Sequence, residues 1–217
     1  MAKAPVAGTV KTRLVPPLTH HQAAEFYRAL LLDQLENLRN IHGAERYLAF
    51  APAHAEVIME HLGGAGYRYL AQRGGDLGER MSNVFGDLWY RGHRCIVLIG
   101  SDLPALPLEF LREAFRQLDC AERKVVLGPS RDGGYYLIGM NQATAELFAS
   151  MTWSHDQVLA ETTARLKALG VSYSLLPSWF DLDTVEDLHR LYEGFNPAMR
   201  QSMPRTRACL ELRLAFK

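Results

Sequence analysis

Short apolar runs alternate with helical patterns along this chain of 217 residues, and the alternation constrains its fold more than any other feature. The run at 95–99 is rich in β-branched residues and is followed by Gly100 and Pro104, which is typical of a strand buried on both faces of a parallel sheet. Further strands are expected at 47–51, 67–71, 125–127, 135–140 and 172–175, and helices at 55–62, 77–90, 108–118, 143–150 and 157–169, after a first helix that begins near Thr19. The pattern predicts an α/β fold, a three-layer sandwich with a mostly parallel mixed sheet, in which the turn at 132–134 allows one antiparallel pair.

Length and composition place this fold in one domain. We expect a single domain over 1–217, with 195–217 as a C-terminal helical tail. Lys and Arg total 24 and Asp and Glu total 24, so no overall charge favours nucleic acid or an anionic membrane. No apolar stretch approaches the roughly 20 residues of a membrane span. Three cysteines without metal or redox spacing favour a reducing, cytoplasmic compartment, and the oligomeric state is left open.

The first cluster of polar residues is a basic loop at the front of the chain. Only residues 1–4 precede Pro5, so either the first strand is very short or the chain starts inside the natural one. Gly8 allows backbone amides to approach a ligand, and Lys3, Lys11 and Arg13 add three cations suited to a nucleotide diphosphate. We expect Lys11 and Arg13 to be exposed or to line a cleft, with Lys11 also acting in catalysis. The alternative is a solvated basic loop, since neither a P-loop nor a Rossmann fingerprint occurs.

The second cluster, at 72–80, lies between a predicted strand and a predicted helix. Its candidate nucleotide contacts are Gly75, Asp76, Gly78 and Arg80, because glycines permit close backbone contact and a helix N-terminus attracts phosphate. A capped turn, with Asp76 as the N-cap and Glu79 completing a capping box, explains the same residues. Both interpretations can hold together.

Two aspartates are the candidate metal ligands. Asp102 follows the buried strand at 95–99, and the carboxyl ends of such strands border the ligand crevice of open α/β sheets. Asp183 precedes the last helical pattern, and Asp181 is a reserve ligand. Mg²⁺ is commonly held by one or two carboxylates plus substrate phosphates, so we predict that Asp102 and Asp183 share Mg²⁺ or Mn²⁺, with their carboxylates within about 8 Å. The alternatives are a turn-capping Asp102 and an Asp183 that is the N-cap of its helix, with Glu186 in the capping box.

Asp132 is the candidate acid on the acceptor side. It is followed by Gly133 and Gly134, which leave room for a substrate, and by Tyr135. A carboxylate there could act as a general base on an acceptor hydroxyl. The alternative is a turn aspartate that bonds its own backbone.

Together these segments resemble a known family. The strings AKAPVAGTVKTRL, GGDLGERM, GSDLPALP, GPSRDGGYYLIG and FDLDTVEDL, which begin at Ala2, Gly74, Gly100, Gly128 and Phe180, are similar to the ordered motifs of a bacterial glycosyltransferase-like group in the GT-A superfamily, some members of which are linked to arsenosugar biosynthesis. The resemblance implies a GT-A fold, a nucleotide in the N-terminal half and a divalent metal near Asp102. A D-x-D motif is absent there.

The ends of the chain also resemble, more distantly, those of sugar-activating and phospholactate-guanylating nucleotidyltransferases. In sugar-activating relatives the acid that matches Asp183 joins the one that matches Asp102 on the metal. Three functions therefore stay open. The first is a metal-dependent glycosyltransferase that moves a sugar from a nucleoside diphosphate to a small acceptor. The second is a nucleotidyltransferase that couples a nucleoside triphosphate to a phosphorylated small molecule and releases pyrophosphate. The third is a non-catalytic nucleotide-binding protein.

Overall fold

The computed structural model describes residues 1–213 and divides them into two compact units built from interleaved segments. The first unit contains Met1, Leu70–Gly100 and Glu109–Phe180, and the second contains Ala2–Tyr69, Ser101–Leu108 and the chain from Asp181 onward. The expectation of a single domain over 1–217 stays a prediction. Among residues 1–213, none of the helices combines the length and the apolarity that a membrane span needs.

A four-stranded sheet forms the centre of the first unit. Its strands are β4 (Ile96–Ile99), β6 (Tyr135–Met140), β5 (Lys124–Pro129) and β7 (Ser172–Leu175), in that order across the sheet. β6 runs antiparallel to both β4 and β5, whereas β5 and β7 are parallel. The predicted antiparallel pair around the turn at 132–134 is thus confirmed. β5 has neighbours on both sides, and its residues 125–127 are completely buried, which explains why they are all apolar.

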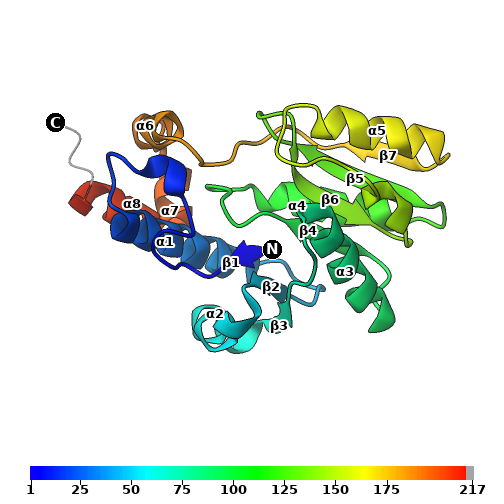
Figure 1. Ribbon diagram of the computed structural model, residues 1–217, viewed down its shortest axis with the longest axis horizontal. Coiled ribbons are helices and arrows are strands. Elements are labelled where there is room, and N and C mark those ends of the chain that lie inside the picture. Colours follow the sequence, from blue (N-terminus) through cyan, green and yellow to red (C-terminus); the bar gives the residue numbers. More distant parts are fainter. Residues whose placement is uncertain (214–217) are drawn as a thin grey trace. The chain divides into compact units, whose positions relative to one another are not determined.

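Three helices pack around this sheet (Figure 1): α3 (Leu77–Tyr90), α4 (Leu108–Leu118) and α5 (Val158–Ala168). α3 contacts β4 and α5 contacts β7. Leu118 at the end of α4 lies so close to Gly139 of β6 that a Cβ atom there would crowd it. The helix predicted at 143–150 is only a 3-10 turn, η4 (Ala145–Phe148), because Thr144 with a φ of −142° and Ala149 with a ψ of 132° have non-helical backbones on either side of it.

The second unit contains a short sheet and most of the helices. β1 (Ala2–Lys3) pairs in parallel with β2 (Tyr47–Ala51). β3 (Arg68–Ala71), of which only Arg68 and Tyr69 belong to this unit, follows in the order β1-β2-β3. β1 comprises two residues, and the choice between the two alternatives for the front of the chain stays open. The remaining elements are η1 (Thr12–Leu14), α1 (His20–Leu38), η2 (Ala53–Ala55), α2 (Glu56–Gly63), η3 (Gly64–Gly66), α6 (Val185–Glu193), α7 (Pro197–Ser202) and α8 (Pro204–Arg213). Thr19 begins α1 with the predicted capping box to Gln22.

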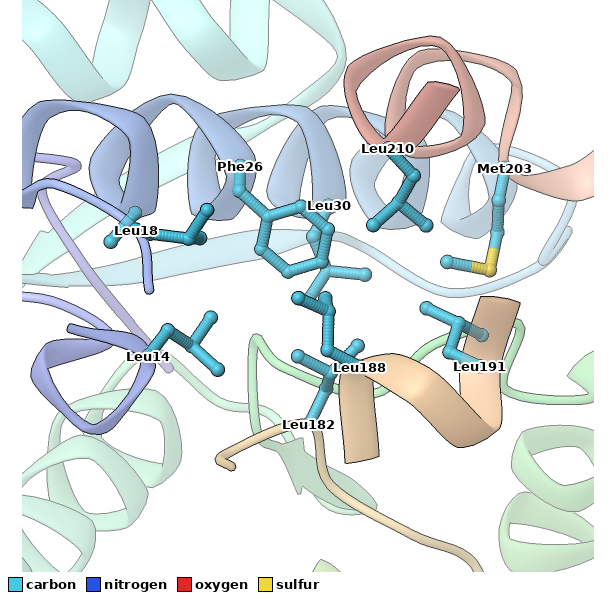
Figure 2. Close-up of a cluster of buried hydrophobic side chains, with 10 residues drawn as sticks. Leu14, Leu18, Phe26, Leu30, Leu182, Leu188, Leu191, Met203 and Leu210 are labelled. Atoms are coloured by element: carbon cyan, nitrogen blue, oxygen red, sulfur yellow. The ribbon is translucent and has the colours of Figure 1, made fainter. Parts of the chain in front are cut away.

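An apolar cluster joins distant segments of this unit (Figure 2). Phe26 and Leu30 project from α1 and meet side chains from the N-terminal loop, from the chain before α6 and from the C-terminal helices. The buried members are Leu14, Leu18, Ala23, Phe26, Leu30, Leu182, Leu188, Leu191, Met203 and Leu210. Burying a leucine side chain contributes about 1.5–3 kcal/mol. The cluster therefore supplies enough free energy to hold charged loops that are attached to it.

The segment predicted as a helical tail is part of this core, as far as it is described. α8 lies along α1 in Figure 1, while residues 214–217 lie outside the described residues. Asp33 on α1 is 1% exposed, and its carboxylate caps α8. One oxygen accepts from the backbone and guanidinium nitrogens of Arg205 at 3.2 Å, and the other accepts from the backbone nitrogen and hydroxyl of Thr206 at 2.8 Å. A buried charge is thereby fully hydrogen-bonded.

We predict that Asp33→Ala lowers the free energy of unfolding by about 2–4 kcal/mol, because it removes a charged cap and leaves buried donors unpaired. Urea denaturation followed by circular dichroism measures the loss. Asp119→Ala is the control, since Asp119 is exposed and its replacement should change stability by no more than about 0.5 kcal/mol. Equal stability of the two variants would show that Asp33 does not anchor α8.

Candidate functional site

Lys11 is the residue around which the candidate site is built. It directly precedes η1 and has a left-handed backbone conformation, with φ 48° and ψ 39°. This conformation costs a residue with a Cβ atom roughly 1–2 kcal/mol. The side chains of Val10 and Leu14 on either side are buried and hold the turn in place. The Lys11 side chain is turned inward, where it is only 5% exposed.

The ammonium group of Lys11 forms ion pairs with two aspartates that are far away in the sequence. Its Nζ atom donates to Oδ2 of Asp102 at 3.0 Å and to Oδ1 of Asp183 at 2.8 Å. Because both oxygens contact one atom, the carboxylates lie within the predicted separation of about 8 Å. Burial would lower the pKa of Lys11, but the two carboxylates outweigh it, so the pKa is raised above its ordinary value and the group is charged at neutral pH.

The two aspartates are held together by the backbone and by the apolar cluster. The Leu182 amide donates to the Asp102 carbonyl oxygen at 3.1 Å, which ties the loop after β4 to the segment that carries Asp183. The Leu182 side chain is completely buried in the apolar cluster, against which Ala105 also packs. Ala105, in the loop that carries Asp102, has a φ of 48° and is therefore left-handed, as Lys11 is in its own loop. Apolar packing thus determines where both carboxylates lie.

Asp183 is not the N-cap of its helix, so that alternative from the sequence is wrong. The N-cap of α6 is Thr184, whose side chain accepts from the backbone nitrogen of Asp187 while the Asp187 carboxylate accepts from the Thr184 backbone nitrogen. The capping box is therefore displaced by one residue from the predicted one. Capping by Thr184 leaves the carboxylate of Asp183 to pair with Lys11. Asp181, the reserve ligand, is half-buried two residues earlier.

Tyr27 supports the site and was not predicted from the sequence. Its hydroxyl accepts from the Lys3 backbone nitrogen at 3.1 Å and lies 2.7 Å from Oγ of Ser101, the residue before Asp102. Burial raises the pKa of this phenol, so it stays neutral and can donate. In the sequence Tyr27 falls on the apolar stripe of a helix and looks like any core residue. Its hydroxyl was the only available signal.

The other basic residues of the N-terminal loop are exposed. Lys3 follows the buried Ala2, and its side chain faces solvent, as does that of Arg13 in η1. Gly8 has a φ of 82° with open space where a Cβ would be, so its conformation alone explains the glycine. The expectation that Lys11 and Arg13 are exposed or line a cleft is met by Arg13, whereas only 5% of the Lys11 side chain is exposed, so any access to Lys11 is from a cleft beside its two carboxylates, and that stays a prediction for Lys11. Its local sequence gave no sign of two distant carboxylates.

The donor set fits a divalent cation of the predicted kind. Within residues 1–213, no group of three or more His, Cys, Asp or Glu side chains is arranged to hold a metal ion. Asp102 and Asp183 supply two carboxylates that converge on one position, and Mg²⁺ typically takes one or two carboxylates together with substrate phosphates. The side chains are 34% and 40% exposed, so the pair is accessible from solvent. The position between them is taken by the ammonium group of Lys11.

The glycine-rich candidate segment lies in the first unit and has the structure of a capped turn. Asp76 is the N-cap of α3 and accepts from the Glu79 backbone nitrogen at 2.8 Å. The Glu79 carboxylate returns to the Gly75 backbone nitrogen at 2.7 Å, and Arg80 donates to the Gly74 carbonyl oxygen. The predicted cap is present, although Glu79 closes on Gly75 rather than on Asp76. Gly78 is needed because Trp153 packs where its Cβ would be. Nucleotide contacts by this segment stay a prediction.

Asp132 also lies in the first unit, in the turn between β5 and β6. It is exposed, and its Oδ1 accepts from the Gly134 backbone nitrogen at 3.0 Å, which is the hydrogen bond expected of a turn aspartate. Gly133 leaves no room for a substrate, because the backbone of Asp156 fills the space of its missing side chain. The second carboxylate oxygen of Asp132 is not used by this bond. A role as general base stays a prediction.

Comparisons with known proteins show what the chain is similar to. A family model described as an uncharacterized protein conserved in bacteria (DUF2064) matches residues 34–155. A crystal structure from Desulfovibrio desulfuricans G20, of a protein proposed to be a nucleotide-diphospho-sugar transferase, is 33% identical, with 98% of this chain and 92% of that chain covered and a TM-score of 0.89. This similarity confirms the predicted α/β fold of the GT-A, or nucleotide-diphospho-sugar transferase, type. No curated protein matches the chain.

A second solved structure is much less similar. The inositol-1-phosphate CTP transferase from T. maritima is 12% identical, with 95% of this chain and 94% of that chain covered and a TM-score of 0.48. A match at this level carries no argument about fold or function.

We predict that Lys11→Ala lowers the free energy of unfolding by about 1–3 kcal/mol, because two neighbouring carboxylates lose their shared cation. The loss should be smaller than that of a fully buried pair, since both carboxylates are more than one-third exposed. Arg13→Ala is the control in the same loop and should cost no more than about 0.5 kcal/mol. Denaturant unfolding measures both. If Asp183→Asn costs the same in the Lys11→Ala background as in the wild type, the two residues are not coupled and the ion pair contributes nothing.

Proposed function

The chain belongs to this bacterial family, DUF2064, and on that premise we propose that it is a transferase that binds a nucleoside-diphosphate sugar and moves the sugar to a small acceptor. The observation that carries the proposal is the convergence of Asp102 and Asp183 on one cation position. Two carboxylates at such a position suit a cation that carries a diphosphate. The relative from D. desulfuricans, itself proposed to act on nucleotide-diphospho-sugars, supports this substrate class.

The N-terminal loop would bind the diphosphate. Arg13 and Lys3 are exposed cations of the same loop as Lys11, and an arginine guanidinium can bind phosphate oxygens in a bidentate manner. Asp102 and Asp183 would hold Mg²⁺ or Mn²⁺. When bound, a divalent cation neutralises charge on a diphosphate leaving group. The Tyr27 hydroxyl contacts both the Lys3 backbone and Ser101, so it would hold the start of the N-terminal loop beside the residue that precedes Asp102.

The remaining candidate residues lie in the first unit. Gly75, Asp76, Gly78 and Arg80 would contact the base or ribose of the nucleotide. Asp132 would accept the proton of the acceptor hydroxyl through its free oxygen, because the turn hydrogen bond engages only Oδ1. Each of these assignments can be tested by itself.

Nucleotidyl transfer is the second candidate, and the two exposed cations favour it. Lys3 and Arg13 could bind the additional phosphate of a nucleoside triphosphate. An acceptor phosphate would then attack the α-phosphorus, and pyrophosphate would leave. The released product distinguishes the candidates, because glycosyl transfer releases a nucleoside diphosphate. A protein that only binds nucleotide releases neither.

We predict that a nucleoside diphosphate or its sugar conjugate, added with Mg²⁺ or Mn²⁺, raises the melting temperature more than the nucleotide or the metal alone. A ligand at one hundred times its Kd stabilises a protein by about 2.7 kcal/mol. A thermal-shift screen over bases, sugars and phosphate chain lengths measures this effect, and the ligands that stabilise are then incubated with candidate acceptors. Release of pyrophosphate would replace the first candidate by the second. Failure of all nucleotides to stabilise the protein would contradict the whole proposal.

We predict that Asp132→Asn leaves nucleotide and metal binding unchanged but lowers turnover about 10²–10⁴-fold, the usual contribution of a general base. The amide oxygen preserves the hydrogen bond from the Gly134 nitrogen, so the turn should be retained. Arg131→Gln is a neighbouring control, because it alters an exposed side chain of the same turn without removing the carboxylate. Steady-state kinetics on the acceptor found above gives kcat for each. Full activity of Asp132→Asn would remove this residue from the mechanism.

A further inference from the structure

The ammonium group of Lys11 occupies the position that a cation shared by Asp102 and Asp183 would need. A lysine ammonium has three hydrogen-bond donors, and two of them are directed at these two carboxylates. The distances of 2.8 and 3.0 Å are those of charge-assisted hydrogen bonds. The carboxylates therefore already share a cation, which belongs to the chain itself.

This internal cation cannot remain in place beside a metal bound by both acids. Oxygen ligands bind Mg²⁺ at about 2.0–2.1 Å, so a metal ion held by the same two oxygens, Oδ2 of Asp102 and Oδ1 of Asp183, would occupy the volume in which Nζ now lies. A lysine side chain can withdraw, because its ammonium group is carried on a flexible four-carbon stem. Once withdrawn, the ammonium would be left without a counter-ion unless another anion reached it.

The local backbone keeps Lys11 directed at the acids. The left-handed conformation at φ 48° is unfavourable for lysine, and the buried side chains of Val10 and Leu14 hold it there. A solvated lysine would gain nothing from such a conformation. Packing energy is therefore used to place a cation between two carboxylates, which is the pattern expected of a positioned functional group rather than of a surface charge.

We propose that Lys11 is a built-in counter-ion that competes with a divalent metal for Asp102 and Asp183, and that it transfers its charge to a phosphate group when the metal binds. The inference rests on the proposed function for the identity of that phosphate group, which is the diphosphate of a nucleotide. A metal alone binds weakly, because it must displace Lys11 and leave an ammonium unpaired. A nucleotide supplies the replacement partner, so metal and nucleotide each strengthen the binding of the other.

Removing the charge of Lys11 tests this competition without any nucleotide. In Lys11→Gln the two acids lose their internal cation, so the affinity for Mn²⁺ alone should rise about tenfold or more, within the range typical of coupled sites. Arg28→Gln is the matched control, because Arg28 is an exposed cation on α1 of the same unit and its removal should leave the affinity unchanged. Electron paramagnetic resonance of free Mn²⁺ gives the dissociation constants. An affinity of Lys11→Gln equal to or weaker than that of the wild type would overturn the proposal.

The same variant tests the coupling. In the wild type, a nucleoside diphosphate should lower the Kd of Mn²⁺ by about tenfold, whereas in Lys11→Gln this enhancement should shrink toward none. Asp183→Asn should weaken Mn²⁺ binding with or without nucleotide. Suppose that nucleotide strengthens Mn²⁺ binding in the wild type and does so equally in Lys11→Gln. This result would refute the role of Lys11 as a counter-ion, while the proposed function would stand. If the protein binds no nucleotide but Lys11→Gln binds Mn²⁺ more tightly than the wild type, the proposed function fails and the competition between Lys11 and the metal stands.

A measurement on the wild type covers the case in which Lys11→Gln does not fold. The buried amine of Lys11 should react slowly with an acylating reagent, whereas the exposed amine of Lys3 in the same loop should react fast. Peptide mass spectrometry quantifies both. Saturating Mn²⁺ should accelerate labelling of Lys11 relative to Lys3, because the displaced side chain becomes accessible. Labelling of Lys11 at the rate of Lys3 in the presence of a chelator, or no response to Mn²⁺, would overturn the proposal.

Discussion

The burial of Leu182 is the interaction on which the candidate site depends. Its side chain is completely enclosed in the apolar cluster of the second unit, together with Leu14 from the loop of Lys11. Its amide bonds the carbonyl oxygen of Asp102, and the next residue is Asp183. One buried leucine thus brings a lysine and two aspartates from three separate segments to within hydrogen-bond distance. Polar groups alone would not do this, because flexible loops lose entropy when they are ordered.

The charged trio is poorly explained as a device for stability. Moving charges out of water costs several kcal/mol per ion, and a buried ion pair often contributes no more than an apolar replacement would. The trio also requires the left-handed backbone at Lys11. Natural proteins keep such costly arrangements mainly at sites of function. Asp33, by contrast, is a buried charge with an evident structural purpose, because its four donors all belong to Arg205 and Thr206 in the first turn of α8.

The glycines of the first unit show how a motif can be conspicuous for structural reasons. Gly78 and Gly133 stand in segments that resemble a nucleotide-binding family, and the sequence predicts a ligand or substrate beside each. Trp153 packs over Gly78, and the Asp156 backbone packs over Gly133. Gly8 differs, because it has open space around it and a φ of 82°. A glycine in a sequence indicates a close approach or an unusual φ, but not which atoms come close.

The sequence by itself determined the local elements and the residue types of the site. Periodicity predicted α3, α4, β2, β6 and β7 with the observed bounds, and the position after a buried strand singled out Asp102, because these signals depend on neighbouring residues. The tertiary structure alone decided which charges meet. Lys11 is 91 residues from Asp102 and 172 from Asp183, and Thr184 rather than Asp183 caps α6. Such pairings depend on how apolar side chains pack the loops together, and no local pattern encodes that packing.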